Sequence, residues 1–66
     1  MSQAKTEAEM ALSRVMRQLD SLVDETTRMR NYKGWAAELR PIYEREIARL
    51  NASIRQLGGR PRKVVL

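Results

Sequence analysis

The sequence contains no cysteine, no histidine and no phenylalanine. Without cysteine the chain has no disulfide, no thiolate nucleophile and no thiolate metal ligand. Without histidine it lacks the side chain that most often performs general acid–base catalysis, and a metal site would have to consist of carboxylates alone. The acidic residues are not clustered for that purpose. We therefore expect no metal and no cofactor.

Long hydrophobic runs are also missing. No segment approaches the roughly 18 consecutive apolar residues of a membrane span, and the N-terminal residues lack the apolar core of a signal peptide. We expect synthesis in the cytoplasm and no membrane partner. A chain of 66 residues forms at most one domain and buries little core. It is therefore expected to gain further stability by oligomerisation or by docking on a partner.

The polar residues do not suggest a catalytic site. Asp24 and Glu25 must point to different faces of a helix because they are adjacent, and Glu44 and Glu46 are equally ill-placed to share a substrate. No serine has a candidate base beside it. The pair Gly58-Gly59 does not follow a strand, so it predicts the end of a helix and not a phosphate-binding loop. We expect a protein that is not an enzyme and takes no small-molecule substrate.

The strongest pattern is a heptad seam in the first half of the sequence. Seam residues recur at spacings of 4 and 3 from Ala8 to Met29, and Thr26 is the only one with a hydroxyl. Thr6 followed by Glu9 matches a capping box. We predict a helix over about residues 7–30, whose broad apolar stripe needs a surface to lie against. The stripe residues that we assign to protein contacts are Leu12, Val15, Met16, Leu19, Leu22, Val23 and Met29.

A second seam follows a break in the pattern. Gly34 is the residue there that most readily adopts a positive φ. Pro41 is favoured in the first turn of a helix and disfavoured in its interior. Two interpretations remain: a short helical turn at 35–40 before a new helix from Pro41, which we favour, or one helix from Trp35 that kinks. The helix over about residues 41–57 carries the apolar residues Tyr43, Ile47, Leu50, Ile54 and Leu57.

Two apolar seams joined by a short connection predict an all-α fold, an antiparallel two-helix hairpin with coiled-coil-like packing over residues 1–57. Two helices cover only one side of each stripe. We therefore expect self-association or docking on a larger protein to complete the fold, and a monomeric hairpin is the less favoured interpretation. Trp35 and Tyr32 flank the connection. They are expected either to cap the end of the core or to serve as aromatic anchors in an interface.

Residues 58–66 form a basic, extended tail. Residues 28–66 carry ten basic and three acidic groups, so this half of the chain is the one that would meet an anion. The stretch 59–63 resembles the core of an AT-hook, which lies in the A·T minor groove. The position before its glycine, usually basic, is Gly58 here. A solubilising tail is the other interpretation. The residues that we assign to contact with nucleic acid or an acidic partner are Arg60, Arg62, Lys63, Arg45 and Arg49.

The tail ends in three apolar residues, Val64, Val65 and Leu66. Apolar residues beyond a basic spacer predict a docking plug, or a strand added to a partner. The alternative is a frayed end without a binding role.

The layout from Pro41 to Leu66 resembles that of the small W-type head–tail joining proteins of tailed phages. The resemblance consists of a helix of the type found at 43–50, then Gly-Arg-Pro-Arg-Lys, then an apolar end. It implies a structural protein whose copies form a ring in the virion. That family places a β-hairpin between its helices, whereas residues 27–40 show neither a strand alternation nor a hairpin turn signal.

These features lead to three functional hypotheses. We favour a non-enzymatic structural or adaptor protein that packs its stripes in a larger assembly, located in the virion if the phage resemblance holds. The alternative is a small dimeric DNA-binding protein with an AT-hook-like tail. A third is a regulator whose helix binds an enzyme, for which the sequence offers no specific feature.

Overall fold

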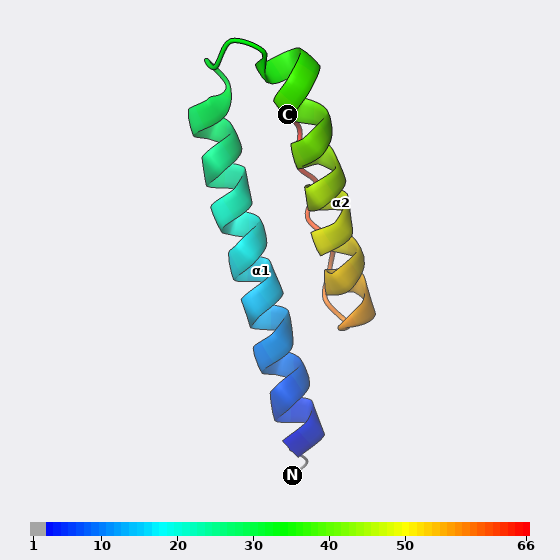
Figure 1. The fold of residues 1–66 in the computed structure, drawn as a ribbon. Helices are drawn as coiled ribbons and strands as arrows, with labels where there is room; N and C mark the ends of the chain where they lie inside the picture. Colours follow the sequence, from blue (N-terminus) through cyan, green and yellow to red (C-terminus); the bar gives the residue numbers. More distant parts are fainter. Residues whose placement is uncertain (1–2) are drawn as a thin grey trace.

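The computed structural model describes the backbone of residues 3–66 and the side chains of residues 6–66. The chain forms α1 (Gln3–Met29), a five-residue π-helical turn η1 (Trp35–Leu39) and α2 (Arg40–Gln56). The two α-helices lie side by side and antiparallel (Figure 1), and the described residues contain no strand. The predicted all-α hairpin is therefore confirmed, while its completion by other chains stays a prediction.

The first helix is longer at its start than the sequence pattern suggested. It already includes Gln3, so Thr6 lies inside α1 and the predicted capping box at Thr6 is wrong. Ala4 and Lys5 are among the better helix formers. Because an N-cap at Thr6 would stabilise the helix by only about 1 kcal/mol, the helix propensity of these residues is enough to extend it past Thr6. Residues 1–2 of the expected 1–57 hairpin lie outside the described residues.

The connection combines the two interpretations of the region around Pro41. Gly34, with φ 96°, precedes η1, and the N–H of Arg40 donates to the carbonyl of Trp35, as in a π-helix. η1 continues directly into α2, in which Pro41 occupies the first turn. Proline has no N–H to donate, so the first turn is where its absence costs least. The helical turn at 35–39 and a helix beginning beside Pro41 are thus parts of one continuous segment.

The core is small and lies between the two seams. Leu19 from α1 and Ile47, Leu50 and Ile54 from α2 are buried. Thr26 is also buried, and its hydroxyl donates to the carbonyl of Val23 at 2.6 Å. A ring of half-buried apolar residues surrounds this cluster: Leu12, Val15, Leu22, Val23, Val64 and Leu66.

The molecule is a rod measuring 51 × 16 × 14 Å. With 27 residues, α1 is longer than the 17-residue α2, and its N-terminal part projects beyond the end of α2 (Figure 1). Neither α1 nor α2, over the residues described, is long and apolar enough to cross a membrane.

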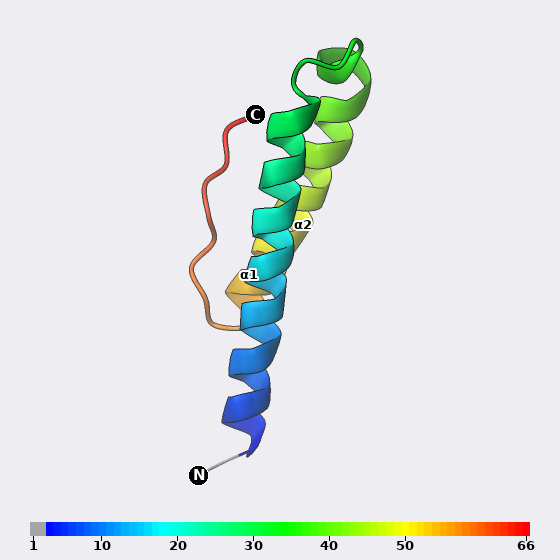
Figure 2. The same cartoon turned by 90° about the vertical axis from the view of Figure 1, so that its left-hand side faces the viewer.

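The tail adds a third layer. After α2 the chain reverses at Gly58, which has φ 85°, and residues 59–66 run back alongside the helices toward the hairpin turn (Figure 2). Val64 and Leu66 pack against the core cluster. The apolar end that we expected to dock on a partner therefore docks on the chain's own hairpin in this structure.

Candidate functional site

Asn51 holds the backbone of the tail. Its side-chain Nδ2 donates to the carbonyl of Arg62 at 2.7 Å, and its Oδ1 accepts from the N–H of the same residue at 2.9 Å. One amide side chain thus satisfies both backbone polar groups of a single tail residue. The arrangement recognises main chain and does not depend on which side chain that residue carries.

The side chain of Arg62 reaches the other helix. Its guanidinium forms an ion pair with the carboxylate of Asp20 on α1, while Asn51 lies on α2. Both charged side chains are exposed, so the pair adds little to stability. Its main effect is geometric, because it ties the tail to α1 in addition to α2. We call Asn51, Asp20 and the tail residues 62–66 the tail clamp.

The end of the tail alternates between the core and solvent. Val64 and Leu66 are half-buried on the core cluster, whereas Val65 between them is 75% exposed. Arg30, beyond the end of α1, donates from Nη2 to the carbonyl of Val65 at 3.3 Å. This alternation with period two is that of a β-strand, although the tail pairs with side chains and not with another strand.

Gly59 makes the approach of the tail to the hairpin possible. Its N–H donates to the carbonyl of Ile54 at 2.8 Å, which closes the end of α2. A Cβ at this position would lie 2.6 Å from Cδ1 of Leu12 and 2.9 Å from Cγ2 of Ile54. Only glycine fits there without displacing core side chains.

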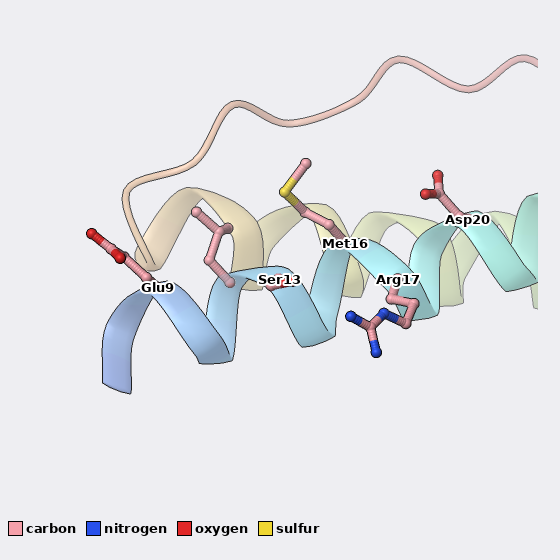
Figure 3. Close-up of a pocket in the computed structure, with 6 residues that line it drawn as sticks. Glu9, Ser13, Met16, Arg17 and Asp20 are labelled. Carbon is pink, nitrogen blue, oxygen red and sulfur yellow. The ribbon is translucent and has the colours of Figure 1, made fainter. Parts of the chain in front are cut away.

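A shallow apolar depression lies on α1 beside the tail (Figure 3). Leu12 and Met16 form its apolar part, and Met16 is 48% exposed. The side chains of Met16 and Asp20 point to the side on which the tail runs, whereas Arg17 points away (Figure 3). The polar side chains at its rim are Glu9, Ser13, Arg17 and Asp20.

The basic residues differ in how they are engaged. Arg49 donates to Glu46, and this hydrogen bond raises the pKa of the Arg49 guanidinium. Arg40 donates to Glu44 at 2.8 Å. Four further cations on α2 and the tail form no ion pair with any described residue: Arg45, Arg55, Arg60 and Lys63. The charge of this part of the surface is therefore only partly neutralised within the chain.

The aromatic residues secure the turn end of the hairpin. The ring centroids of Trp35 and Tyr43 are 5.4 Å apart. The Tyr43 hydroxyl donates to Oε1 of Glu25 at 2.9 Å. That hydrogen bond raises the pKa of Tyr43 and links α2 to α1. Trp35 is half-buried, whereas Tyr32 is exposed. The packing of Trp35 on Tyr43 matches the expected capping role, and the interface role of Trp35 and Tyr32 stays a prediction.

The predicted contact residues fall into three groups by burial. Those buried inside the hairpin, and so unable to contact another chain in this fold, are Leu19, Ile47, Leu50 and Ile54. The half-buried ones are Leu12, Val15, Leu22, Val23, Met29, Trp35, Tyr43, Leu57, Val64 and Leu66. The exposed ones are Met16, Val65, Arg45, Arg49, Arg60, Arg62 and Lys63.

Reasoning from sequence missed the residues that receive the tail. Asp20 and Asn51 looked like ordinary polar positions on helix surfaces. One weak indication concerned Asn51. Asparagine is a poor helix former, so its position inside the predicted helix 41–57 is consistent with a specific side-chain contact.

Within the described part of the chain, no three histidine, cysteine, aspartate or glutamate side chains are grouped closely enough to hold a metal ion. Comparison with protein-family models, with curated proteins and with solved structures found no match to this chain.

Proposed function

We propose that this protein is a non-enzymatic assembly module, which binds copies of itself through exposed apolar side chains in the N-terminal half of α1. The observation that carries the proposal is the contrast between a core of four buried hydrophobic residues and two exposed methionines in the N-terminal half of α1. Met10 is 60% and Met16 48% exposed. Methionine adapts its shape to varied apolar surfaces and is common in binding faces.

The rod shape supports the same proposal. The N-terminal part of α1 extends beyond the end of α2, so this segment has no helix opposite it in the described chain. An amphipathic helix without a partner favours association with another helix. In the finer form that follows from the phage resemblance, several copies assemble into a ring within a virion.

Sedimentation velocity over a wide concentration range tests the proposal. We expect the mass to rise above that of one chain as concentration increases. Met16→Glu should weaken this association at least tenfold, because it places a charge in the apolar contact. Gln18→Glu is the matched control, since it adds the same charge at an exposed position on another face of α1. A mass of one chain at every concentration, unaffected by either change, would refute the proposal.

A second candidate is nucleic-acid binding, and one observation favours it. Arg45, Arg49 and Arg55 surround the small residues Ala48 and Ala52 on the outer face of α2, and these five are all exposed. The exposed Ile42 lies one turn before Arg45 on the same face. The density of cations on this surface nevertheless resembles that of protein–DNA interfaces more than that of protein–protein interfaces. The tail contributes Arg60 and Lys63 to the exposed cations.

The structure changes how such binding would work. Because Arg62 is paired with Asp20, an AT-hook-like insertion of the tail would first have to break this ion pair. Contact with phosphates through α2 requires no such rearrangement. Fluorescence anisotropy with duplex DNA distinguishes the two modes. Phosphate contact predicts that Arg45→Ala and Arg55→Ala each weaken binding and reduce the salt slope, while Arg17→Ala on α1 does not. Minor-groove insertion predicts that Arg60→Ala has the larger effect and that A·T-rich duplexes bind better.

A further inference from the structure

We infer that the surface of α1 and α2 on which the tail lies, here called the groove, is a binding site for an extended peptide with the spacing Arg-x-Val-x-Leu. The tail of a second copy occupies it when copies assemble. In this structure the site holds the chain's own tail, with the clamp residues Asn51 and Asp20 on Arg62. The inference rests on the proposed self-association and names the contact that would link neighbouring copies.

The helix residues of the clamp, Asn51 and Asp20, have the features of a peptide receptor. Asn51 donates to and accepts from one residue of an extended backbone, which holds the main chain in place whatever its side chain. Arg30 adds a second main-chain contact three residues farther on, at the carbonyl of Val65. The groove therefore fixes the direction and the register of the bound segment from two points.

Side chains at alternate positions supply the specificity. Arg62 meets the carboxylate of Asp20, and Val64 and Leu66 meet the apolar core, while Lys63 and Val65 are exposed. Extended peptides that bind by main-chain hydrogen bonds are commonly selected through every second side chain. A matching ligand needs a cation followed at two-residue intervals by two aliphatic residues. This pattern occurs in the tail of every copy.

The link between hairpin and tail allows exchange. The reversal depends on Gly58 and Gly59. Between Gly59 and the clamp, Arg60 and Pro61 form no hydrogen bond with any residue that the structure describes. The clamp contacts themselves are exposed hydrogen bonds and half-buried side chains, so releasing the tail costs little compared with unfolding the hairpin. A tail seated on a neighbour makes the same contacts as one seated on its own hairpin, which is the condition for domain swapping.

Assembly decides between the two arrangements. In dilute solution the tail binds the groove of its own chain, because the covalent link gives it a high effective concentration there. Once copies are held together through α1, the groove of a neighbour becomes comparably close. Exchange then replaces the tail contacts within each copy by the same contacts between copies.

Charge reversal across the clamp tests the inference with full-length chains. Asp20→Arg places two positive groups opposite each other within one chain, and Arg62→Asp places two negative groups there. Each variant should therefore hold its own tail poorly. When the two are mixed, the groove of the first is complementary to the tail of the second. We expect native mass spectrometry to show a one-to-one heterodimer in at least tenfold excess over either homodimer.

Controls separate exchange from general charge effects. Asp24→Arg mixed with Arg60→Asp carries the same charge changes outside the clamp and should show no such excess. The double variant Asp20→Arg/Arg62→Asp should restore the closed tail of the single chain. Circular dichroism verifies that each variant keeps its helices, since both clamp positions are exposed and lie outside the buried core.

The outcomes are distinct for the two proposals. Self-association of the natural chain without preferential heterodimer formation would overturn the exchange of tails but leave the assembly function standing. A heterodimer from the clamp variants, together with a natural chain that stays monomeric, would show that the groove accepts a tail from another copy while the assembly function fails. Equal amounts of heterodimer in the clamp pair and the control pair would contradict the peptide site itself.

Discussion

Asn51 and Arg62 are joined by two hydrogen bonds in opposite directions, one to the carbonyl and one to the N–H of the same tail residue. Each neutral hydrogen bond contributes about 1 kcal/mol net. Asn51→Ala should therefore open the tail about tenfold or more often. Alanine is also the better helix former, so α2 should not weaken. Hydrogen exchange at the amides of residues 62–66 measures the opening.

Gln56→Ala is the matched control for that experiment, because it removes an exposed amide from α2 outside the clamp. Exchange in the tail should stay unchanged in this variant, and exchange in the core should stay unchanged in both. If Asn51→Ala left the tail amides as protected as before, the clamp would have no role in holding the tail.

Gly59 and Gly58 should respond differently to substitution. An alanine Cβ at Gly59 would meet Cδ1 of Leu12 at 2.6 Å, and overpacking of this kind typically costs about 1–3 kcal/mol. Gly58 has open space around it but φ 85°, so alanine there costs about 1 kcal/mol through backbone strain. Urea denaturation of the two variants measures both costs.

A double-mutant cycle checks that the cause at Gly59 is steric. Leu12→Ala removes the atom in the way, so the cost of Gly59→Ala should shrink in that background by at least about 0.5 kcal/mol. Asparagine tolerates the left-handed region, so Gly58→Asn should be milder than Gly58→Ala. Strict additivity of Leu12→Ala and Gly59→Ala would rule out the contact as the cause.

Thr26 is a buried hydroxyl in an otherwise apolar seam, and its own helix satisfies it through the carbonyl of Val23. Thr26→Val keeps the branched shape and removes a polar group from the core. Helix propensity hardly changes between the two residues. We expect stability to rise by about 0.5–1 kcal/mol in urea denaturation. A loss of stability of more than about 1 kcal/mol would show that the hydrogen bond of the Thr26 hydroxyl stabilises the fold by more than burial of the hydroxyl destabilises it.

The Tyr43 hydroxyl donates to Glu25, which raises its pKa above the ordinary value of about 10. The folded chain therefore retains this proton to higher pH than the unfolded chain. The stability that the Tyr43–Glu25 hydrogen bond contributes is fully present below a pH of about 10, and it is lost as the pH rises through the raised pKa of Tyr43. In the Tyr32→Phe variant, tyrosinate absorbance reports Tyr43 alone and should show a midpoint above 10. Adding Glu25→Gln should lower that midpoint, and a midpoint unaffected by this change would exclude Glu25 as the cause.

The helices and the contents of their shared core could be predicted from the sequence, because both follow from local periodicity. Leu19, Ile47, Leu50 and Ile54 recur at heptad spacing, and the same spacing that marks them in the sequence turns them to one face of a helix. The start of α1 differs from the predicted one, because a cap contributes no more than the helix propensity of the few residues before it. The π-helical turn was also not foreseen, since the pattern around Pro41 fits either a break or a kink.

A helical hairpin with a basic tail is predictable from the sequence alone, since helix periodicity, the glycines and the charge of residues 28–66 are properties of neighbouring residues. The path of the tail, in contrast, depends on contacts between segments that are far apart in the sequence. Arg62 pairs with Asp20 across 42 positions of sequence, and Gly59 packs against Leu12 because helix packing has already placed the end of α2 beside this part of α1. Contacts of this kind depend on the packed geometry of distant segments, and no spacing of residues along the chain predicts them.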